Sequence, residues 1–415
     1  MLAVLAFTAC SNDSDEAAGN DNHIWHVSLT ASMGDATNRA LDADGNTITA
    51  KFAASEEVKV VKSNGSVVGT LTPQTVGTKT TTLTGEITGS FSNNEVLTLR
   101  YHSETANYDN QVGTLVGISA NQDNAEATLT ITDATSMTFV SNSVTFKSKQ
   151  SITKFSFNDG TNPINVKTFG IAATGLVQSI AANGTETVGA VTGTLATPSS
   201  DVYVALRNKE TGTKTYSFTI QDKDGNWYIF TKAANLTNGK NYTATVSMTK
   251  LANLTSTEGT VGVIDGLPAI VVDFSGTKKA VALMNAGALC PEHYGKYYTF
   301  ANQSSGLSND WKVPTQAELT ALAGKANAWV TQNGVNGGLF TIGSEKLFLP
   351  AAGYYDTEGT PGFVNRLEHG YYWSSTDGTG TDYIVILEFY NTNAANMNSI
   401  NKKHGLTVRP FHSLP

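Results

Sequence analysis

One short segment, Glu57-Val58-Lys59-Val60-Val61-Lys62-Ser63-Asn64-Gly65-Ser66-Val67-Val68-Gly69-Thr70-Leu71, carries the strongest structural signal in the sequence. Two valine-rich runs, 57–61 and 67–71, flank the dipeptide Asn64-Gly65. β-Branched residues favour extended strands, and Asn-Gly favours the left-handed backbone of a tight turn. The segment therefore predicts an antiparallel hairpin, and the chain around it is expected to be β-structure.

The same alternation of short strands and turns continues along the chain to about residue 250. Charged residues make up only 15% of the sequence and glycine reaches 38 residues, which favours sandwiches with many turns over helical bundles. Further strands are expected at 24–29, 47–52, 96–101, 127–131, 136–140, 152–157, 202–206, 216–220, 227–230 and 242–248. This spacing predicts two β-sandwich domains, 40–148 and 149–250.

The composition changes after a Thr/Gly-rich linker at 251–266, and an α+β domain is expected over 267–415. Strands are predicted at 270–274, 280–284, 347–349, 371–376, 384–387 and 406–410. Thr315 and Glu318 have the spacing of a capping box, which predicts a helix starting there. Leu319, Leu322, Trp329 and Val330 would form its apolar stripe, and Gly334 would end it.

The N-terminal residues favour an exported lipoprotein. An apolar run at 2–7 leads through small residues to Cys10 and then into a polar, acidic stretch. This order suits a signal peptide remnant at 1–9, with lipid attached to the Cys10 sulfur and a leader or pro-segment at 10–39. The alternative is an ordinary buried cysteine. If Cys10 is lipidated, Cys290 has no partner, and it is expected to be an inert buried thiol rather than a nucleophile.

Composition and motifs argue against several functional classes. Twenty-seven basic residues stand against 35 acidic ones with no basic run, so no nucleic acid partner is expected. No Gly-x-Ser-x-Gly, His-Glu-x-x-His or phosphate-binding glycine motif occurs, and no cofactor is expected. Acidic turns at 42–46 and 222–226 could suggest calcium, but they lack a downstream bidentate glutamate, and turn chemistry explains 222–226. No metal is predicted.

Residues 10 to about 250 resemble the fimbrillin family, the lipoprotein pilins of Bacteroidales that build type V pili. The resemblance rests on the start Cys10-Ser11-Asn12-Asp13-Ser14-Asp15-Glu16, on Asn38-Arg39-Ala40-Leu41, on the stretch 48–58 and on Gly239-Lys240-Asn241-Tyr242. It implies two transthyretin-like β-sandwich domains.

The resemblance also implies assembly by donor-strand exchange. A protease would cut between Arg39 and Ala40, and a neighbouring subunit would fill the groove left by the first strand. The displaced strand would consist of Ile24, Trp25, His26, Val27, Ser28 and Leu29. Stalk or adaptor pilin subunits would be the partners, and the lipid would hold the precursor at the outer membrane.

Residues 260–415 resemble FISUMP-type, C-type-lectin-like domains. The matching blocks are Trp311-Lys312-Val313-Pro314-Thr315, Leu347-Phe348-Leu349-Pro350-Ala351-Ala352-Gly353-Tyr354, Tyr372-Trp373-Ser374-Ser375-Thr376 and Gly405-Leu406-Thr407-Val408-Arg409-Pro410. The calcium-ligand triplets and paired cysteines of calcium-dependent lectins are lacking, which argues against calcium-mediated sugar binding. Because this domain would seal the C-terminal strand, the sequence predicts a tip pilin with an adhesive C-terminal domain.

The predicted contact surface is the loop 354–371, which would bind a host or microbial glycan or protein. Its candidate residues are Tyr354, Tyr355, Asp356, Glu358, Arg366, Glu368, His369 and Tyr371. The alternative is that the tyrosines pack against Trp373 and the charges are solvated. Two other functions stay open: a lipid-anchored binding protein outside any fibre, and an enzyme related to formylglycine-generating or hydrolytic enzymes. The protein is expected not to be an enzyme.

Overall fold

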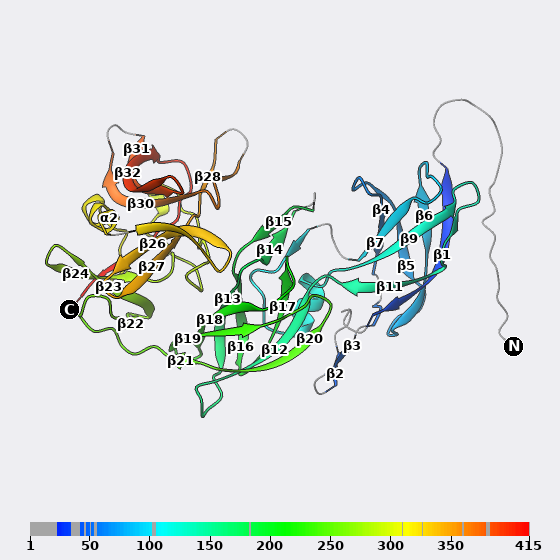
Figure 1. The fold of residues 1–415 in the computed structure, drawn as a ribbon, viewed down its shortest axis with the longest axis horizontal. Coiled ribbons are helices and arrows are strands. Elements are labelled where there is room, and N and C mark those ends of the chain that lie inside the picture. The colour runs from blue at the N-terminus through cyan, green and yellow to red at the C-terminus, as the bar shows by residue number, and fades with distance from the viewer. Residues whose placement is uncertain are drawn as a thin grey trace.

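The computed structural model describes residues 23–34, 42–44, 47–49, 51–53, 56–101, 105–181, 184–308, 310–325, 327–358, 361–378 and 382–414. They form three β-rich units that follow one another along the long axis of the molecule (Figure 1). The multidomain, mainly-β fold class expected from the sequence is confirmed. No helix among the described residues is long and apolar enough to cross a bilayer.

The first unit is a sheet that closes on itself. Its hydrogen-bonded order is β10-β9-β11-β1-β6-β5-β4-β7, and β7 pairs again with β9. The strands are β1 (Ile24–Met33), β4 (Val58–Val61), β5 (Val67–Pro73), β6 (Thr80–Thr88), β7 (Val96–Tyr101), β9 (Ala125–Asp133), β10 (Thr138–Phe139) and β11 (Ser143–Ser148), with β2 (Asp42–Asp44) and β3 (Thr47–Thr49) as a separate pair. The expected β4–β5 hairpin is confirmed, and Gly65 takes a φ of 86° in its turn.

The second unit is a sandwich of two sheets, β15-β14-β17-β12-β20 and β16-β13-β18-β19-β21, around one apolar core. The strands are β8 (Ala106–Asn107), β12 (Ser151–Asn158), β13 (Val166–Ala172), β14 (Leu176–Ile180), β15 (Glu186–Val188), β16 (Val191–Ser199), β17 (Asp201–Asn208), β18 (Lys214–Asp222), β19 (Trp227–Ala234), β20 (Asn241–Ser247) and β21 (Thr249–Lys250). Helix α1 (Leu115–Asn121), which the sequence did not predict, is capped by the Thr114 side chain.

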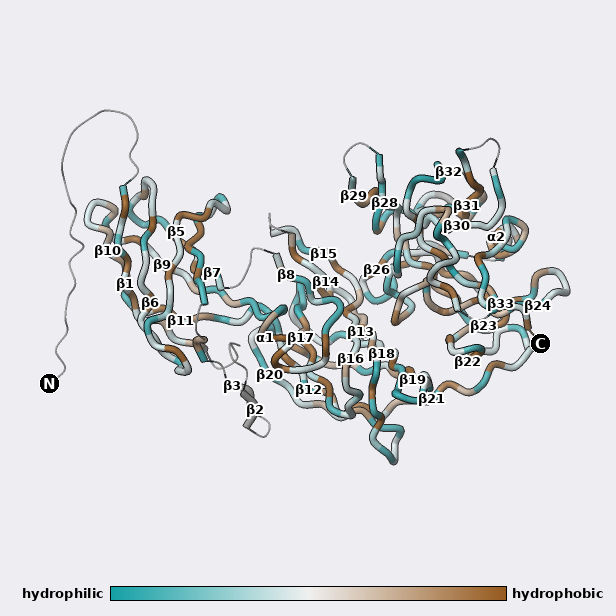
Figure 2. The backbone as a smooth tube through the Cα atoms, turned by 180° about the vertical axis from the view of Figure 1, so that it is seen from behind, coloured by the Kyte–Doolittle hydropathy of each residue, from teal (hydrophilic) through white to brown (hydrophobic). Residues whose placement is uncertain are grey.

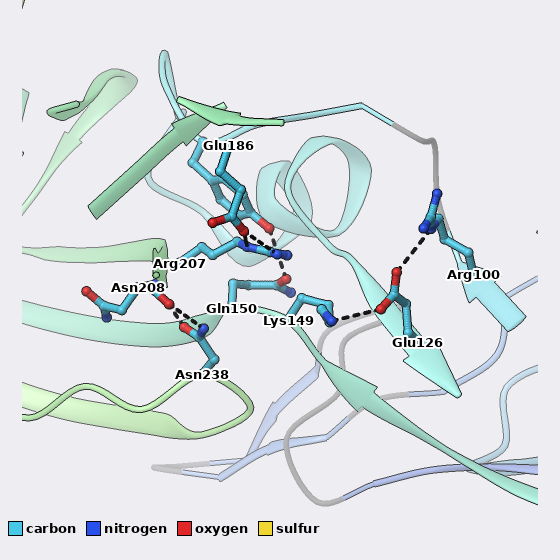
Figure 3. A network of polar contacts seen from close by, with 9 residues as sticks. Arg100, Glu126, Lys149, Gln150, Glu186, Arg207, Asn208 and Asn238 are labelled. Atoms are coloured by element: carbon cyan, nitrogen blue, oxygen red, sulfur yellow. Dashed lines mark hydrogen bonds and ion pairs between the residues drawn. The ribbon is translucent and has the colours of Figure 1, made fainter. Parts of the chain in front are cut away.

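The chain enters the second unit before it has completed the first. Tyr108 and Ile118 pack in the core of the second unit, whereas β9 and β11 return to the first sheet. At this junction Glu126 accepts from Arg100 and Lys149, and the buried Gln150 accepts from the Tyr108 hydroxyl (Figure 3). Residues 105–122 therefore pack with the second unit, although they precede β9 and β11 in the chain.

The third unit contains four small sheets: β22-β23-β24-β33, β25-β26-β27, β28-β29 and β30-β31-β32. Its elements are β22 (Val261–Ile264), β23 (Leu267–Phe274), β24 (Thr277–Ala282), the 3₁₀ helix η1 (Phe300–Asn302), α2 (Gln316–Ala323), β25 (Asn327–Gln332), β26 (Val335–Ile342), β27 (Glu345–Pro350), β28 (Tyr354–Asp356), β29 (Gly362–Val364), β30 (His369–Asp377), β31 (Tyr383–Tyr390), β32 (Asn393–Asn401) and β33 (Phe411–Ser413).

Two expectations for this unit need correction. The capping box of Thr315 and Glu318 is present, but α2 ends at Ala323, and Trp329 and Val330 lie in strand β25. The apolar residues after Leu322 do not continue the helix, because residues 327–332 pair with β26 instead. The final strand is also displaced: 406–410 makes only isolated bridges, and β33 pairs antiparallel with β24.

The sequence blocks that resemble lectin-like domains occupy core positions. Trp311 and Trp373 are buried, and the Trp373 indole donates to the carbonyl of Tyr298 at 2.6 Å. Arg409 is fully buried and donates to the carbonyls of Ala282 and Phe348, which joins β24 to β27. These residues therefore hold the third unit together rather than contact a ligand.

Candidate binding site

Strand β1 lies between β6 and β11 in the closed sheet, antiparallel to β6 and parallel to β11. Its side chains alternate strictly: Trp25, Val27 and Leu29 are buried, whereas Ile24, His26 and Ser28 are exposed. Hydrophilic and hydrophobic positions are interspersed along the strands of this unit (Figure 2). One whole face of β1 contributes to the core of the first unit.

The other residues predicted for processing cannot be placed. Cys10, Arg39 and Ala40 lie outside the described residues. Lipidation at Cys10 and cleavage after Arg39 therefore stay predictions.

The predicted binding loop forms the β28–β29 hairpin, and its candidate residues divide into two groups. In the first, the Tyr354 and Tyr371 rings meet edge to face with centroids 5.5 Å apart. His369 stacks on Tyr371, and its Nδ1 lies 3.0 Å from the Tyr371 hydroxyl and 3.3 Å from Glu388 Oε1. Burial raises the pKa of Tyr371 to about 12. This group is a packed network within the third unit.

The acidic candidates lie at the edge of this network. Asp356 Oδ1 is 3.3 Å from His404 Nδ1, and the exposed Glu358 accepts from Lys403 at 2.9 Å. Glu368 is exposed. The packing alternative considered for the tyrosines thus holds for Tyr354 and Tyr371, although their neighbours are His404 and His369 rather than Trp373 alone.

The second group faces a cleft between the second and third units. The Arg366 guanidinium carbon lies 4.1 Å from the centroid of the Tyr294 ring and 4.9 Å from that of Phe363. Its Nη2 donates to Gln178 Oε1 on β14 at 3.2 Å. Arg366 therefore contacts aromatic rings of the third unit and an amide of the second. The ribbon and the tube views both place the β28–β29 hairpin on the side that faces β14 and β15 (Figures 1 and 2).

The cleft has a volume of about 560 Å³. Its lining from the second unit comes from β8, β14 and the segment after β8, and its lining from the third unit comes from residues 293–297 and the β28–β29 hairpin. An aromatic group stands at its rim: the half-exposed Phe363 has ring centroids of Tyr297 and Tyr355 at 5.0 and 5.2 Å. Burial raises the pKa of Tyr297, whose hydroxyl donates to the carbonyl of Ala352 at 2.5 Å.

A side-chain contact links the two walls of the cleft. Asp109 Oδ2 lies 3.0 Å from His293 Nε2, and Asp109 Oδ1 accepts from the Thr192 hydroxyl and amide. Burial acts to raise the pKa of Asp109, but the His293 hydrogen bond and charge and the Thr192 hydroxyl outweigh it and hold that pKa below its usual value. The one carboxylate lining the described cleft is therefore already paired.

The two units meet closely beside the cleft. Gly170 on β13 lets the third unit approach, since a Cβ there would lie 2.6 Å from Cys290 Cβ and 2.8 Å from the Leu289 carbonyl oxygen. Cys290 is 1% exposed, and burial raises the pKa of its thiol well above the ordinary value. Asn333 adds hydrogen bonds to Ser217 and Glu292. Cys290 is thus a packing residue of the docked surface.

Two groups of acidic residues lie close enough together to be considered as cation sites. Asp222 accepts from the amides of Asp224 and Asn226 and from the Tyr228 hydroxyl, so the turn itself uses its oxygens. Asp265, Asp310 and His412 have ligand atoms within 4.8 Å of one another, but His412 Nε2 already hydrogen-bonds Asp265 at 2.8 Å. Neither group has the oxygen-rich set that a calcium ion prefers.

Sequence reasoning found one of the residues that define the cleft and missed the others. Arg366 was predicted, because it lies in a loop rich in aromatic and charged residues. Asp109, Gln178, His293 and Lys296 come from distant segments and carry no local motif. Only the fold, which docks one unit on the other, brings them together.

Comparisons with known proteins give distant structural matches alone. Neither a protein-family model nor a curated protein matches the chain. A "putative cell adhesion protein" of Bacteroides uniformis matches over 54% of this chain and 96% of its own, with 15% identity and a TM-score of 0.33. A similarly named protein of Bacteroides ovatus gives 13% identity, 54% and 94% coverage and a TM-score of 0.31. A fimbrial assembly protein of Parabacteroides distasonis gives 9% identity, 60% and 96% coverage and a TM-score of 0.30. Likeness at this level does not establish a shared fold.

Proposed function

We propose that the protein is an accessory pilin of a type V pilus, placed at the fibre tip, that accepts a strand from a neighbouring subunit and acts as an adhesin through its C-terminal unit. The observation that carries the proposal is the position of β1. It is the first strand among the described residues, it lies between two other strands, and it contributes one whole face to the core.

Loss of β1 would open the closed sheet between β6 and β11. The backbone groups of Ile24–Met33 pair with β6 over Thr80–Thr88 and with β11 over Ser143–Phe146. Without β1, both edges would present unpaired donors and acceptors beside an apolar trough. An incoming strand with the same alternation would satisfy the edges and refill the core. Cleavage between Arg39 and Ala40 would free β1 for this exchange.

The proposed tip position rests on the last described strand, β33. A stalk subunit has to offer a strand to the next subunit. Here β33 pairs with β24, and Phe411 packs in the core of the third unit. Because β33 is engaged in its own domain, it supports the proposal that this subunit accepts a strand and does not donate β33 to another subunit. The domain limits 40–148, 149–250 and 267–415, the lectin-like assignment of the third unit and the lipid anchor at Cys10 belong to the same proposal.

Strand exchange can be measured directly. A specific protease site is inserted between residues 34 and 42, the purified chain is cut, and a fluorescent peptide with the sequence of residues 23–34 is added. We expect incorporation into the cut protein and none into the uncut protein. A matched peptide with aspartate in place of Val27 and Leu29 should not enter, because both side chains point into the core. Exclusion of the native peptide from the cut, folded protein would overturn the proposal.

The tip position and the fibre itself need separate tests. Cut protein mixed with stalk subunits should add to one end of a fibre, and fibres formed by this chain alone would contradict the assignment. N-terminal sequencing of surface material distinguishes the fibre subunit from a free lipoprotein. A mature chain that begins at Ala40 supports the pilin, and an uncut, lipid-bearing N-terminus supports a surface-binding lipoprotein outside the fibre.

A further inference from the structure

The cleft between the second and third units carries unpaired positive charge. Neither Arg366 nor Lys296 forms an ion pair with a carboxylate among the described residues, and Arg366 Nε is buried without a hydrogen-bond partner. The carboxylate of Asp109, by contrast, is matched by His293. The cleft thus brings together two cations without a carboxylate partner, in a protein whose formal net charge is −8.

The Arg366 guanidinium is held in place before any ligand arrives. It lies between the Tyr294 and Phe363 rings and is fixed at one end by Gln178. A planar, immobilised guanidinium suits a charge-assisted hydrogen bond to a carboxylate. Lys296 is exposed at the same cleft and can add attraction without fixed geometry.

An aromatic surface adjoins these cations. Phe363 is 52% exposed, although it packs against Tyr297 and Tyr355. Exposed aromatic rings offer a flat apolar contact for the C–H face of a sugar ring, and hydroxyl groups can be met by the polar lining. The cleft volume of about 560 Å³ lies within the usual range for small-ligand sites.

We propose that this cleft binds the terminal acidic sugar of a glycan, with the carboxylate on Arg366 and Lys296 and the sugar ring against Phe363. The proposal rests on the adhesive part of the proposed function and is independent of strand exchange. The shared chemistry is a six-membered sugar ring bearing a carboxylate, which sialic acids and uronic acids both supply. Because residues of both units line the site, the ligand would also bridge them.

Titration calorimetry on the full chain tests the proposal with N-acetylneuraminic acid, glucuronic acid and galacturonic acid. The methyl ester of each acid is the matched neutral ligand. We expect saturable binding of at least one acid and at least tenfold weaker binding of its ester, since the charge-assisted contact with Arg366 and Lys296 is lost. The acid that binds identifies the source. Equal affinity for acid and ester, or no binding of any acid at millimolar concentration, would overturn the proposal.

Three variants locate the site. Arg366→Gln should weaken binding at least tenfold, and Lys296→Gln should weaken it severalfold and reduce its salt dependence. Phe363→Ala removes the ring contact. Lys403→Gln is the matched control, because Lys403 is exposed and pairs with Glu358 outside the cleft. Lys296 and Phe363 are exposed, so their variants should fold even if Arg366→Gln loosens the docking. Wild-type affinity in both exposed-site variants would overturn the site.

The two proposals can fail separately. A preparation that takes up the β1 peptide but binds no acidic sugar refutes the ligand and leaves the pilin intact. Sugar binding without strand exchange refutes the pilin assignment and leaves the ligand proposal intact. Binding of a short peptide through its C-terminal carboxylate, with no sugar bound, would overturn the sugar assignment.

Discussion

Replacement of Leu29 by alanine is expected to loosen the first unit at β1. Leu29 is 2% exposed and points into the core beside β6. Truncation of a buried leucine costs about 2–5 kcal/mol, from lost transfer energy and the cavity that remains. For a domain of this size, each kcal/mol lowers the melting temperature by about 4–8 °C. The first unit should therefore melt at least about 8 °C lower than in the wild type.

The buried side chains of β1 together account for a large part of the stability of the first unit. Burial of a large apolar side chain stabilises a domain by about 1.5–3 kcal/mol, so Trp25, Val27, Leu29 and Met33 together contribute roughly 6–12 kcal/mol. That equals most of the 5–15 kcal/mol by which an ordinary domain is stable. A cut β1 should consequently stay bound until another strand replaces it, and Leu29→Ala should accelerate the replacement.

Calorimetry combined with hydrogen exchange distinguishes this expectation from general destabilisation. Ser28→Ala is the matched control, because Ser28 neighbours Leu29 and is exposed. In Leu29→Ala, amides of β1, β6 and β11 should exchange faster, whereas those of β23 in the third unit should not change. A melting temperature equal to that of Ser28→Ala, or faster exchange spread evenly over all three units, would refute the reasoning.

Three further changes have defined outcomes. Gly170→Ala should weaken docking of the third unit by about 1–3 kcal/mol through overpacking. In a protein whose other cysteine is replaced by serine, the Cys290 thiol, which is buried in the wild type, should then react with a thiol reagent. Gly324→Ala is the control, because its Cβ would meet only ordinary contacts, and it should leave the thiol protected. Asp109→Asn should cost about 1–3 kcal/mol at pH 7 in urea unfolding. The pKa of Asp109 in the folded protein lies below its usual 3.8. The difference in unfolding free energy between the wild type and Asp109→Asn should therefore persist down to about pH 3.8 and disappear as the pH falls through the folded pKa. A difference that is unchanged at pH 2 would contradict the pairing. Thr315→Ala should cost about 1 kcal/mol in the third unit through loss of the helix cap, and no change in its melting would refute that contribution.

Local signals in the sequence predicted most strands but not the way they assemble. Asn64-Gly65 identified the β4–β5 hairpin, because turn chemistry acts within a few residues. The apolar residues after Leu322 were assigned to a helix, since a stripe at helical spacing and a strand on a half-buried sheet share apolar positions. The excursion of residues 105–122 into the second core depends on contacts with β14 and β17, which no local pattern encodes.

The two proposed activities belong to different parts of the protein and can be regulated apart. Strand acceptance depends on β1 and its neighbours in the first unit, whereas the cleft is built by the second and third units. Docking at Gly170 and Cys290 holds the cleft walls together, and no lining residue comes from β1 to β7. Replacement of β1 should therefore leave ligand affinity unchanged. Conversely, a ligand that contacts both walls of the cleft stabilises the docked arrangement of the second and third units by mass action. Ligand binding should therefore oppose separation of these two units and leave strand exchange at β1 unchanged.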